Sequence, residues 1–274
     1  MATPREKVSS VDPIWTALRQ QAEAMAGREP SLAGFVHATI LQHDRLEQAL
    51  SYHLAHKLGG DDLSPLAIRE MFDDLDAAED SFGQAVRADL SAVFERDPAC
   101  HSYLDAFLFY KGFHALESWH VSHWLWREGR KAMALFLQSR ISQLFAVDVH
   151  PAAQIGRGIM FDHATGIVIG ETAVIGDDVS MLQGVTLGGT GAERGDRHPK
   201  IGKGVLLGAG AKVLGNIEIG DYAKIASGSV VLKDVPTGCT AAGVPARLVN
   251  CPQCPEPART MDHTLADIVY DYVI

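Results

Sequence analysis

The sequence lacks the long apolar runs and the basic charge that would tie it to membranes or nucleic acids. None of its 274 residues falls in an apolar run of the roughly 18 residues that a membrane helix requires. Residues 1–7 carry no apolar signal core, so we expect a cytoplasmic protein without membrane contact. A net charge of −10 argues against nucleic acid as a partner.

Cysteine is scarce, and no phosphate-binding loop of a familiar type is present. The four cysteines, Cys100, Cys239, Cys251 and Cys254, are too few and too scattered for a disulfide framework. Cys251 and Cys254 form a lone Cys-x-x-Cys without a second pair, which disfavours a zinc site. No glycine-rich string of the Walker or Rossmann type occurs, so a nucleotide-like ligand would have to bind along another kind of surface.

What the chain does have is a period of six in its second half. An aliphatic or aromatic residue returns at every sixth position in three registers: Val149, Ile155, Phe161; Ile169, Ile175, Met181, Leu187; and Ile201, Leu207, Val213, Ile219, Ile225, Val231. A short strand followed by a tight corner turns the same face inward once per hexad. One coil cannot bury its own face, so the coils must stack. The pattern predicts a parallel β-helix over residues 146–250.

The period breaks at two places. Eight positions separate Phe161 from Ile169, and the long gap from Leu187 to Ile201 holds the polar, glycine-rich segment 188–200. With no apolar side chain to bury, this segment is expected to leave the prism as an extruded loop. Loops on rigid scaffolds commonly carry function.

Residues 1–145 show helical patterns throughout. Helix starts are expected at Asp12-Pro13, Ser64-Pro65 and Asp97-Pro98, one helix is expected from Ser31 to Gly59, and residues 102–145 are unusually aromatic. After Asn250 a proline-rich stretch without periodicity predicts a flexible tail. We therefore expect an α+β chain with a helical domain at 1–145, a β-helix domain at 146–250 and a tail at 251–274.

One combination of residues points to acid–base chemistry. If a coil takes about 18 residues, Asp148 and His163 are nearly one coil apart and can meet on adjacent coils. A carboxylate on one imidazole nitrogen leaves the other free to accept a proton. A hydrogen-bonded structural histidine at a coil corner explains the same spacing equally well. His120 and His123, three apart on a helix, offer two metal ligands, but no third is evident, so no metal is expected.

Four strings together resemble the serine acetyltransferase family. They are residues 148–153, 158–166, 187–191 with 196–200, and 242–247, and the helical half and the terminal isoleucine resemble the family as well. The resemblance implies a left-handed β-helix that transfers acetyl from acetyl-CoA to the hydroxyl of L-serine, as the first step of cysteine biosynthesis. No permanent cofactor is implied. Sugar and antibiotic acyltransferases share the hexads and the Gly-Val-Pro-Ala ending, so another acceptor is an alternative.

The resemblance also implies residue roles. His163 would be the general base and Asp148 its partner, Arg197 would bind the serine carboxylate with His198 beside it, and Asp162 and Asp97 would bind the ammonium. A capping role explains Asp97 without any ligand. For acetyl-CoA, the implied contacts are the backbone near Gly189 and Ala209 and the side chains of Lys224, Lys233 and Arg247, although corner lysines are usually just solvated.

Partners are implied by the same resemblance. We expect a trimer or a dimer of trimers, feedback inhibition by L-cysteine at the serine site, and binding of cysteine synthase through a tail anchored by Ile274. A rival from another class is a trimeric β-helix zinc carbonic anhydrase, for which the sequence offers His150, His163 and His198. Arg197 beside His198 opposes it, because its positive charge repels a cation.

Overall fold

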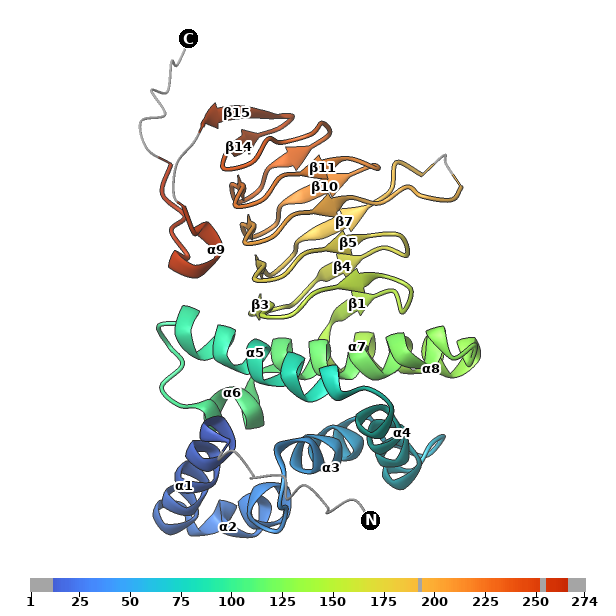
Figure 1. Ribbon diagram of the computed structural model, residues 1–274, viewed down its shortest axis with the longest axis vertical. Helices are drawn as coiled ribbons and strands as arrows, with labels where there is room; N and C mark the ends of the chain where they lie inside the picture. The colour runs from blue at the N-terminus through green and yellow to red at the C-terminus, as the bar shows by residue number, and fades with distance from the viewer. Residues whose placement is uncertain (1–11, 192–193, 252–254, 266–274) are drawn as a thin grey trace, which may run out of the picture.

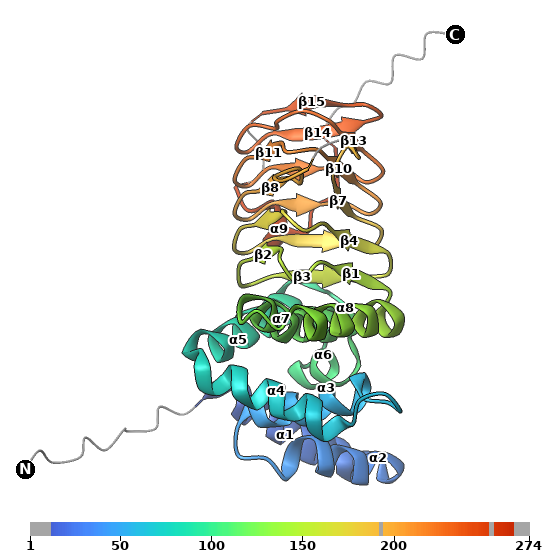
Figure 2. The same cartoon turned by 90° about the vertical axis from the view of Figure 1, so that its right-hand side faces the viewer.

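The computed structural model describes residues 12–191, 194–251 and 255–265. It consists of a helical domain from which a prism of stacked coils rises along one long axis (Figure 1). A long loop leaves the side of the prism between strands β7 and β8, and the quarter-turn view shows the coils as a ladder above the helices (Figure 2).

The helical domain ends at Phe145. Its helices are α1 Pro13–Arg28, α2 Pro30–Val36, the π-helix η1 His37–Leu41, α3 Leu46–Leu58, α4 Pro65–Ala78, α5 Asp80–Arg96, α6 Tyr103–Phe109, α7 Lys111–Arg127 and α8 Lys131–Phe145. The Asp12 side chain accepts hydrogen bonds from the first backbone N–H groups of α1, and Ser64 caps α4, as the sequence predicts.

Two helix predictions are wrong. The helix expected from Ser31 to Gly59 breaks after η1 and resumes only at α3. Side chains of α1 stabilise this break by binding its carbonyl groups. Arg19 donates to the carbonyl of His43, and the Trp15 indole donates to that of Asp44. Asp97 does not start a helix either. It ends α5, and its carboxylate accepts a hydrogen bond from the Ala99 N–H at 2.8 Å.

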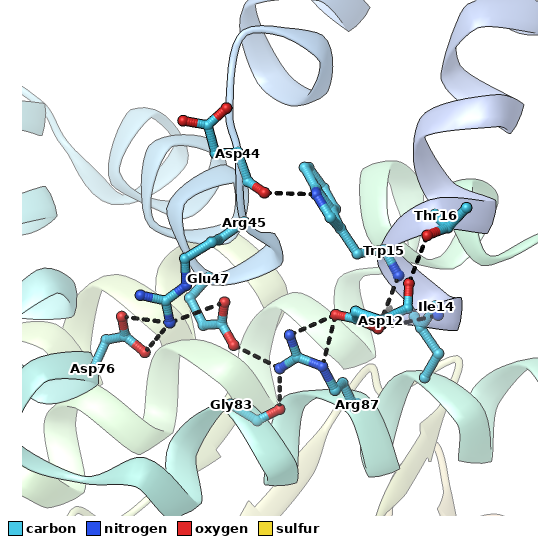
Figure 3. A network of polar contacts seen from close by, with 10 residues as sticks. All are labelled: Asp12, Ile14, Trp15, Thr16, Asp44, Arg45, Glu47, Asp76, Gly83 and Arg87. Atoms are coloured by element: carbon cyan, nitrogen blue, oxygen red, sulfur yellow. Dashed lines mark hydrogen bonds and ion pairs between the residues drawn. The ribbon is translucent and has the colours of Figure 1, made fainter. Parts of the chain in front are cut away.

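A partly buried network around Arg87 connects three helices of this domain (Figure 3). The Arg87 guanidinium, on α5, binds the Asp12 carboxylate before α1 at 2.6 Å and the Glu47 carboxylate on α3 at 2.5 Å. Its Nη1 also donates to the carbonyl of Gly83. Burial alone would raise the pKa of Glu47, but the hydrogen bond and charge of Arg87 outweigh it and hold that pKa below its usual range.

The prism has three faces of parallel strands. Face A is β1-β4-β7-β10-β13, face B is β2-β5-β8-β11, and face C is β3-β6-β9-β12-β14, extended by the antiparallel β15. The bounds are β1 Val147–Val149, β2 Gln154–Ile155, β3 Met160–Asp162, β4 Ile167–Ile169, β5 Val174–Ile175, β6 Ser180–Leu182, β7 Thr186–Gly188, β8 Lys200–Ile201, β9 Leu206–Leu207, β10 Lys212–Leu214, β11 Glu218–Ile219, β12 Lys224–Ile225, β13 Val230–Val231, β14 Thr240–Gly243 and β15 Ala246–Asn250.

The hexad residues fill the axis of the prism, as predicted. All of them are at most 5% exposed except Ile155, which is partly buried against the same core. The extra residues of segment 188–200 leave the prism between β7 and β8, where Figure 1 shows the loop standing away from the coils. The repeat and the position of its main interruption are confirmed.

The described part of the expected tail is docked on face C. Helix α9, Pro257–Thr260, packs on this face, and the Ser180 hydroxyl donates to the carbonyl of Ala258 at 2.9 Å. A single disulfide joins Cys239 to Cys251, a pairing that the sequence analysis did not predict. The free thiol of Cys100 is buried. No described helix has the length and hydrophobicity to span a membrane.

Candidate active site

His163 lies at the corner between faces C and A, beside a cavity of about 410 Å³. Helix α7 packs tightly against β3 there, since a Cβ atom at Gly112 would lie 2.0 Å from the carbonyl oxygen of Phe161. Only glycine permits this approach. The cavity is lined by Val93, Asp97, Ala99, Tyr110, Lys111, Gly112, Phe113, Met160, Phe161, Asp162 and His163.

The cavity gathers three of the predicted site residues around its mouth. The His163 ring lies 3.9 Å from the Asp162 carboxylate and is 76% exposed. Burial, helped by the negative charge of Asp97, raises the pKa of Asp162. Two carboxyl groups and an imidazole at one opening suit a ligand that carries an ammonium group and a hydroxyl.

The predicted pairing of Asp148 with His163 is not formed within the single chain. The first coil is longer than the assumed period, because Asp148 pairs with Val168 in the strand register. The Asp148 carboxylate accepts a hydrogen bond from Gln138 Nε2 at 2.7 Å, and it lines a separate cavity beside α8. The ring partner of His163 among the described residues is Asp162.

Arg197 and His198 are held at a different corner, between faces A and B. Arg197 Nη2 donates to Glu171 at 2.8 Å, which holds the pKa of Glu171 below its usual range. The Thr172 hydroxyl accepts from the backbone N–H groups of Arg197 and His198, and the His198 ring contacts this hydroxyl at 2.8 Å. Burial, then the charge of Arg197, lowers the pKa of His198.

Glu171 and Thr172 are residues that the motif search missed. They follow Gly170 at the end of β4, one coil before the extruded loop returns to the prism at Lys200. Gly170 itself must be glycine, because a Cβ there would lie 2.0 Å from the His198 ring. Glu171 and Thr172 could have been found by one feature: they lie at the same corner of the prism as the loop that carries Arg197 and His198.

The two groups of residues are at opposite ends of β4. The His163 corner immediately precedes this strand, and the corner of Glu171 and Thr172 immediately follows it. A three-residue strand alone spans roughly 10 Å. One chain therefore places the predicted site residues in two separate groups, which we call the acidic half-site (Asp97, Asp162 and His163) and the basic half-site (Arg197 and His198).

The residues expected to contact acetyl-CoA fall into two groups. Gly189 and Ala209 are partly exposed, and Lys233 and Arg247 are exposed at the last coils. Lys224 differs: it is 5% exposed on face C, and its Nζ donates to the carbonyls of Asp262 and Thr264. The ammonium group of Lys224, which was expected to face a phosphate of acetyl-CoA, is thus already hydrogen-bonded to the docked part of the tail.

Comparison of the sequence with known proteins and family models identifies the family. The family model "Serine acetyltransferase, N-terminal" matches residues 14–118, and "Bacterial transferase hexapeptide (six repeats)" matches 198–233. A serine acetyltransferase of Salmonella typhimurium is 55% identical over 249 residues, which cover 91% of each chain. The chain belongs to the serine acetyltransferase family. Its fold is accordingly the left-handed β-helix that the resemblance implied.

Solved structures of serine acetyltransferases support the family assignment. One in complex with cysteine has a TM-score of 0.90 and 52% identity, covering 92% of this chain and 98% of that one. One from Brucella abortus in complex with coenzyme A has a TM-score of 0.89 and 50% identity, covering 91% and 100%. The activity is therefore serine O-acetylation with acetyl-CoA as co-substrate, which decides against the carbonic anhydrase reading.

Proposed function

We propose that L-serine is acetylated at a site completed by two copies of the chain. The observation that carries this proposal is the separation of the acidic and basic half-sites by β4. The ammonium and carboxylate of serine are attached to one carbon atom, so a single serine cannot reach both half-sites of one chain. A threefold assembly, in which the basic corner of one prism meets the acidic corner of the next, brings them together.

The reaction then needs no covalent enzyme intermediate. His163 accepts the proton of the serine hydroxyl as its oxygen attacks the thioester carbonyl of acetyl-CoA. A C–O bond forms, the C–S bond breaks, and the imidazolium returns the proton to the departing thiolate of CoA. Asp162, the carboxylate nearest to the ring, stabilises the imidazolium in the single chain. Asp148 remains the partner implied by the family resemblance.

Binding of the amino acid follows from charge. Asp97 and Asp162 supply negative charge for the ammonium, and the planar guanidinium of Arg197 suits a carboxylate. Glu171 fixes Arg197, and Thr172 fixes the backbone beside it, so the fork is oriented before the ligand arrives. L-cysteine differs from L-serine only in its thiol, so we propose that it competes at the same site as an inhibitor.

Acetyl-CoA is proposed to lie along the prism between two copies. The backbone near Gly189 and Ala209 is partly exposed there, and Lys233 and Arg247 offer exposed positive charge for phosphates. Lys224 would have to exchange its contacts with the Asp262 and Thr264 carbonyls to join them. We therefore place Lys233 and Arg247 ahead of Lys224 in this role.

A complementation experiment tests the shared site. His163→Ala and Arg197→Ala variants are each expected to be nearly inactive, but co-expressed chains would rebuild intact sites where the two kinds meet. For random assembly into trimers, about a quarter of the sites would be intact. Activity that stays at the level of the separate variants, in hybrids verified by affinity tags, contradicts a site shared between chains.

The proposed partner of the tail is cysteine synthase, as in the family resemblance. A terminal carboxylate with an apolar side chain can imitate an amino-acid substrate. Ile274 lies outside the described residues. Deletion of Ile274 is expected to abolish co-purification with cysteine synthase while serine acetylation is unchanged. Unaltered binding by the shortened chain rejects the anchor.

A further inference from the structure

A cluster of three titratable side chains lies between the helical domain and the first coil, outside the site described above. Asp89 comes from α5, and Glu117 and His120 come from α7. One oxygen or nitrogen of each lies within 4.8 Å of the other two. Asp89 and Glu117 are completely buried, and His120 is 14% exposed.

The cluster has more ligand atoms than hydrogen-bond partners. Asp89 Oδ1 accepts a hydrogen bond from the Ile159 N–H at 2.7 Å, but Asp89 Oδ2 has no partner. Both carboxylate oxygens of Glu117 and the Nε2 atom of His120 are also buried and without hydrogen-bond partners among the described residues. Buried polar atoms are normally hydrogen-bonded, so four atoms that face one another at one point without a hydrogen bond of normal length require an explanation.

We propose that Asp89, Glu117 and His120 form a binding site for a divalent transition-metal ion of the zinc class. Two carboxylates and a neutral imidazole provide the donor set and balance the charge of a dication. The Asp89 Oδ2 and His120 Nε2 atoms are 3.6 Å apart. Ligands at about 2.0–2.2 Å from a tetrahedral ion lie roughly 3.3–3.6 Å from each other, so the pair is already spaced for one.

An entry route adjoins the cluster. His120 lines a cavity of about 300 Å³, together with Phe82, Trp119 and His123. An ion that enters there meets the imidazole first and the two carboxylates behind it.

The location suggests what the ion would do. Ile159, whose N–H binds Asp89, directly precedes β3, the strand that leads to Asp162 and His163. Helix α5, which carries Asp89, ends at Asp97. An ion on this cluster would join α5, α7 and the first coil, and so fix the two segments that supply the acidic half-site.

A proton shared between the two carboxyl groups is the competing explanation. Two charged carboxylates cannot remain side by side in a dry interior without a counter-ion or a proton. Metal binding must displace such protons, so the two states are distinguished by whether the chain takes up an ion and releases protons.

The experiment uses the full chain stripped with a chelator and then titrated with Zn²⁺ or Co²⁺. We expect one tight site per chain by calorimetry, proton release in the buffer comparison, and a visible d–d absorption band with Co²⁺. Glu117→Gln keeps the side-chain shape and removes one ligand charge, so affinity is expected to fall roughly 100-fold or more with the fold retained.

Matched controls separate this site from adventitious binding. Glu128→Gln changes an exposed residue just beyond the end of α7, and His56→Gln changes an exposed histidine. Both are expected to keep the tight site, whereas His120→Gln is expected to lose it. Wild-type chain without a tight site, or Glu117→Gln and His120→Gln variants that bind as the wild type does, would overturn the proposal in favour of a shared proton.

Discussion

His163 owes its position to a backbone conformation that few side chains adopt. It and Ala164 have φ values of 53° and 58°, in the left-handed region that favours glycine. Two consecutive residues of this kind turn the chain sharply between β3 and β4. The turn leaves the imidazole exposed at the corner, where a partner prism or a substrate can reach it.

The first prediction concerns this imidazole. His163→Ala is expected to lower the turnover number by roughly 10²–10⁴-fold, because the serine hydroxyl then loses its positioned base. Coenzyme A affinity, measured by calorimetry, should change little. The exposed His101→Ala serves as the control and should retain full turnover. Near-normal turnover of His163→Ala would remove this residue as the base.

Individual residues show which features of the candidate site could be predicted from the sequence and which could not. The Asp162-His163 pair, Arg197 and His198 were predicted as site residues from motifs, and the structure places each at a prism corner. The contact between Asp148 and His163 was inferred from an average coil length. The first coil instead aligns Asp148 with Val168, because the corner at 163–166 takes extra residues. Local insertions of this kind shift a register that spacing alone cannot reveal.

At the scale of elements, the arginine network of Figure 3 connects helices that are far apart in sequence. Glu47 is 5% exposed, whereas Arg87 is 30% exposed, so the carboxylate depends for its charge balance on Arg87 and, at a longer distance, on Arg45. Removing Arg87 leaves the buried Glu47 carboxylate with only the 3.3 Å contact of the more exposed Arg45. Loss of one partner of a buried pair is costly, whereas exposed pairs contribute little.

The second prediction follows from that asymmetry. Arg87→Met is expected to lower the free energy of unfolding by about 3 kcal/mol, the lower end of the range for buried pairs, because Arg87 is partly exposed. Urea unfolding measures the change. Arg130→Met, an exposed arginine before α8, should leave the midpoint unchanged. Equal midpoints for Arg87→Met and wild type would show that the network does not stabilise the helical domain.

Elements differ in how well they could be predicted. The hexads were predicted because a strand and corner repeat locally, with one inward residue per hexad. The break between η1 and α3 was missed because its carbonyls bind Arg19 and Trp15, which lie on another helix. Docking of α9 was missed for the same reason. Ser180, which binds α9, and Lys224, which binds the residues just after it, come from coils far away in sequence.

At the scale of the whole molecule, burial of two histidines makes stability depend on pH. His53 on α3 and His114 on α7 are 3% and 2% exposed, with ring centroids 5.1 Å apart. Burial lowers the pKa of each to about 3, and in His53 the charge of His114 adds to this effect. Both rings are neutral in the native protein at pH 7, and they gain protons readily only on unfolding.

The third prediction concerns how the free energy of unfolding changes with pH. The unfolded chain binds protons at these histidines below about pH 6.5 and the native chain only near pH 3, so stability falls as the pH falls between these values. Each histidine contributes about 1.4 kcal/mol per pH unit. His114→Gln should therefore show a shallower decline in urea unfolding from pH 6 to 4, whereas exposed His101→Gln should not. Parallel slopes for His114→Gln and wild type would refute the assignment.

The sequence by itself determined the β-helix, the helical half and the family, because repeats and motifs are properties of neighbouring positions. It also predicts the roles of Asp162, His163, Arg197 and His198. Only the tertiary structure decided that the acidic and basic halves lie at opposite ends of β4, and that Asp89 and Glu117 lie beside His120, while His123 stays outside their cluster. Such arrangements depend on which distant segments the packing brings together, and spacing along the chain does not encode them.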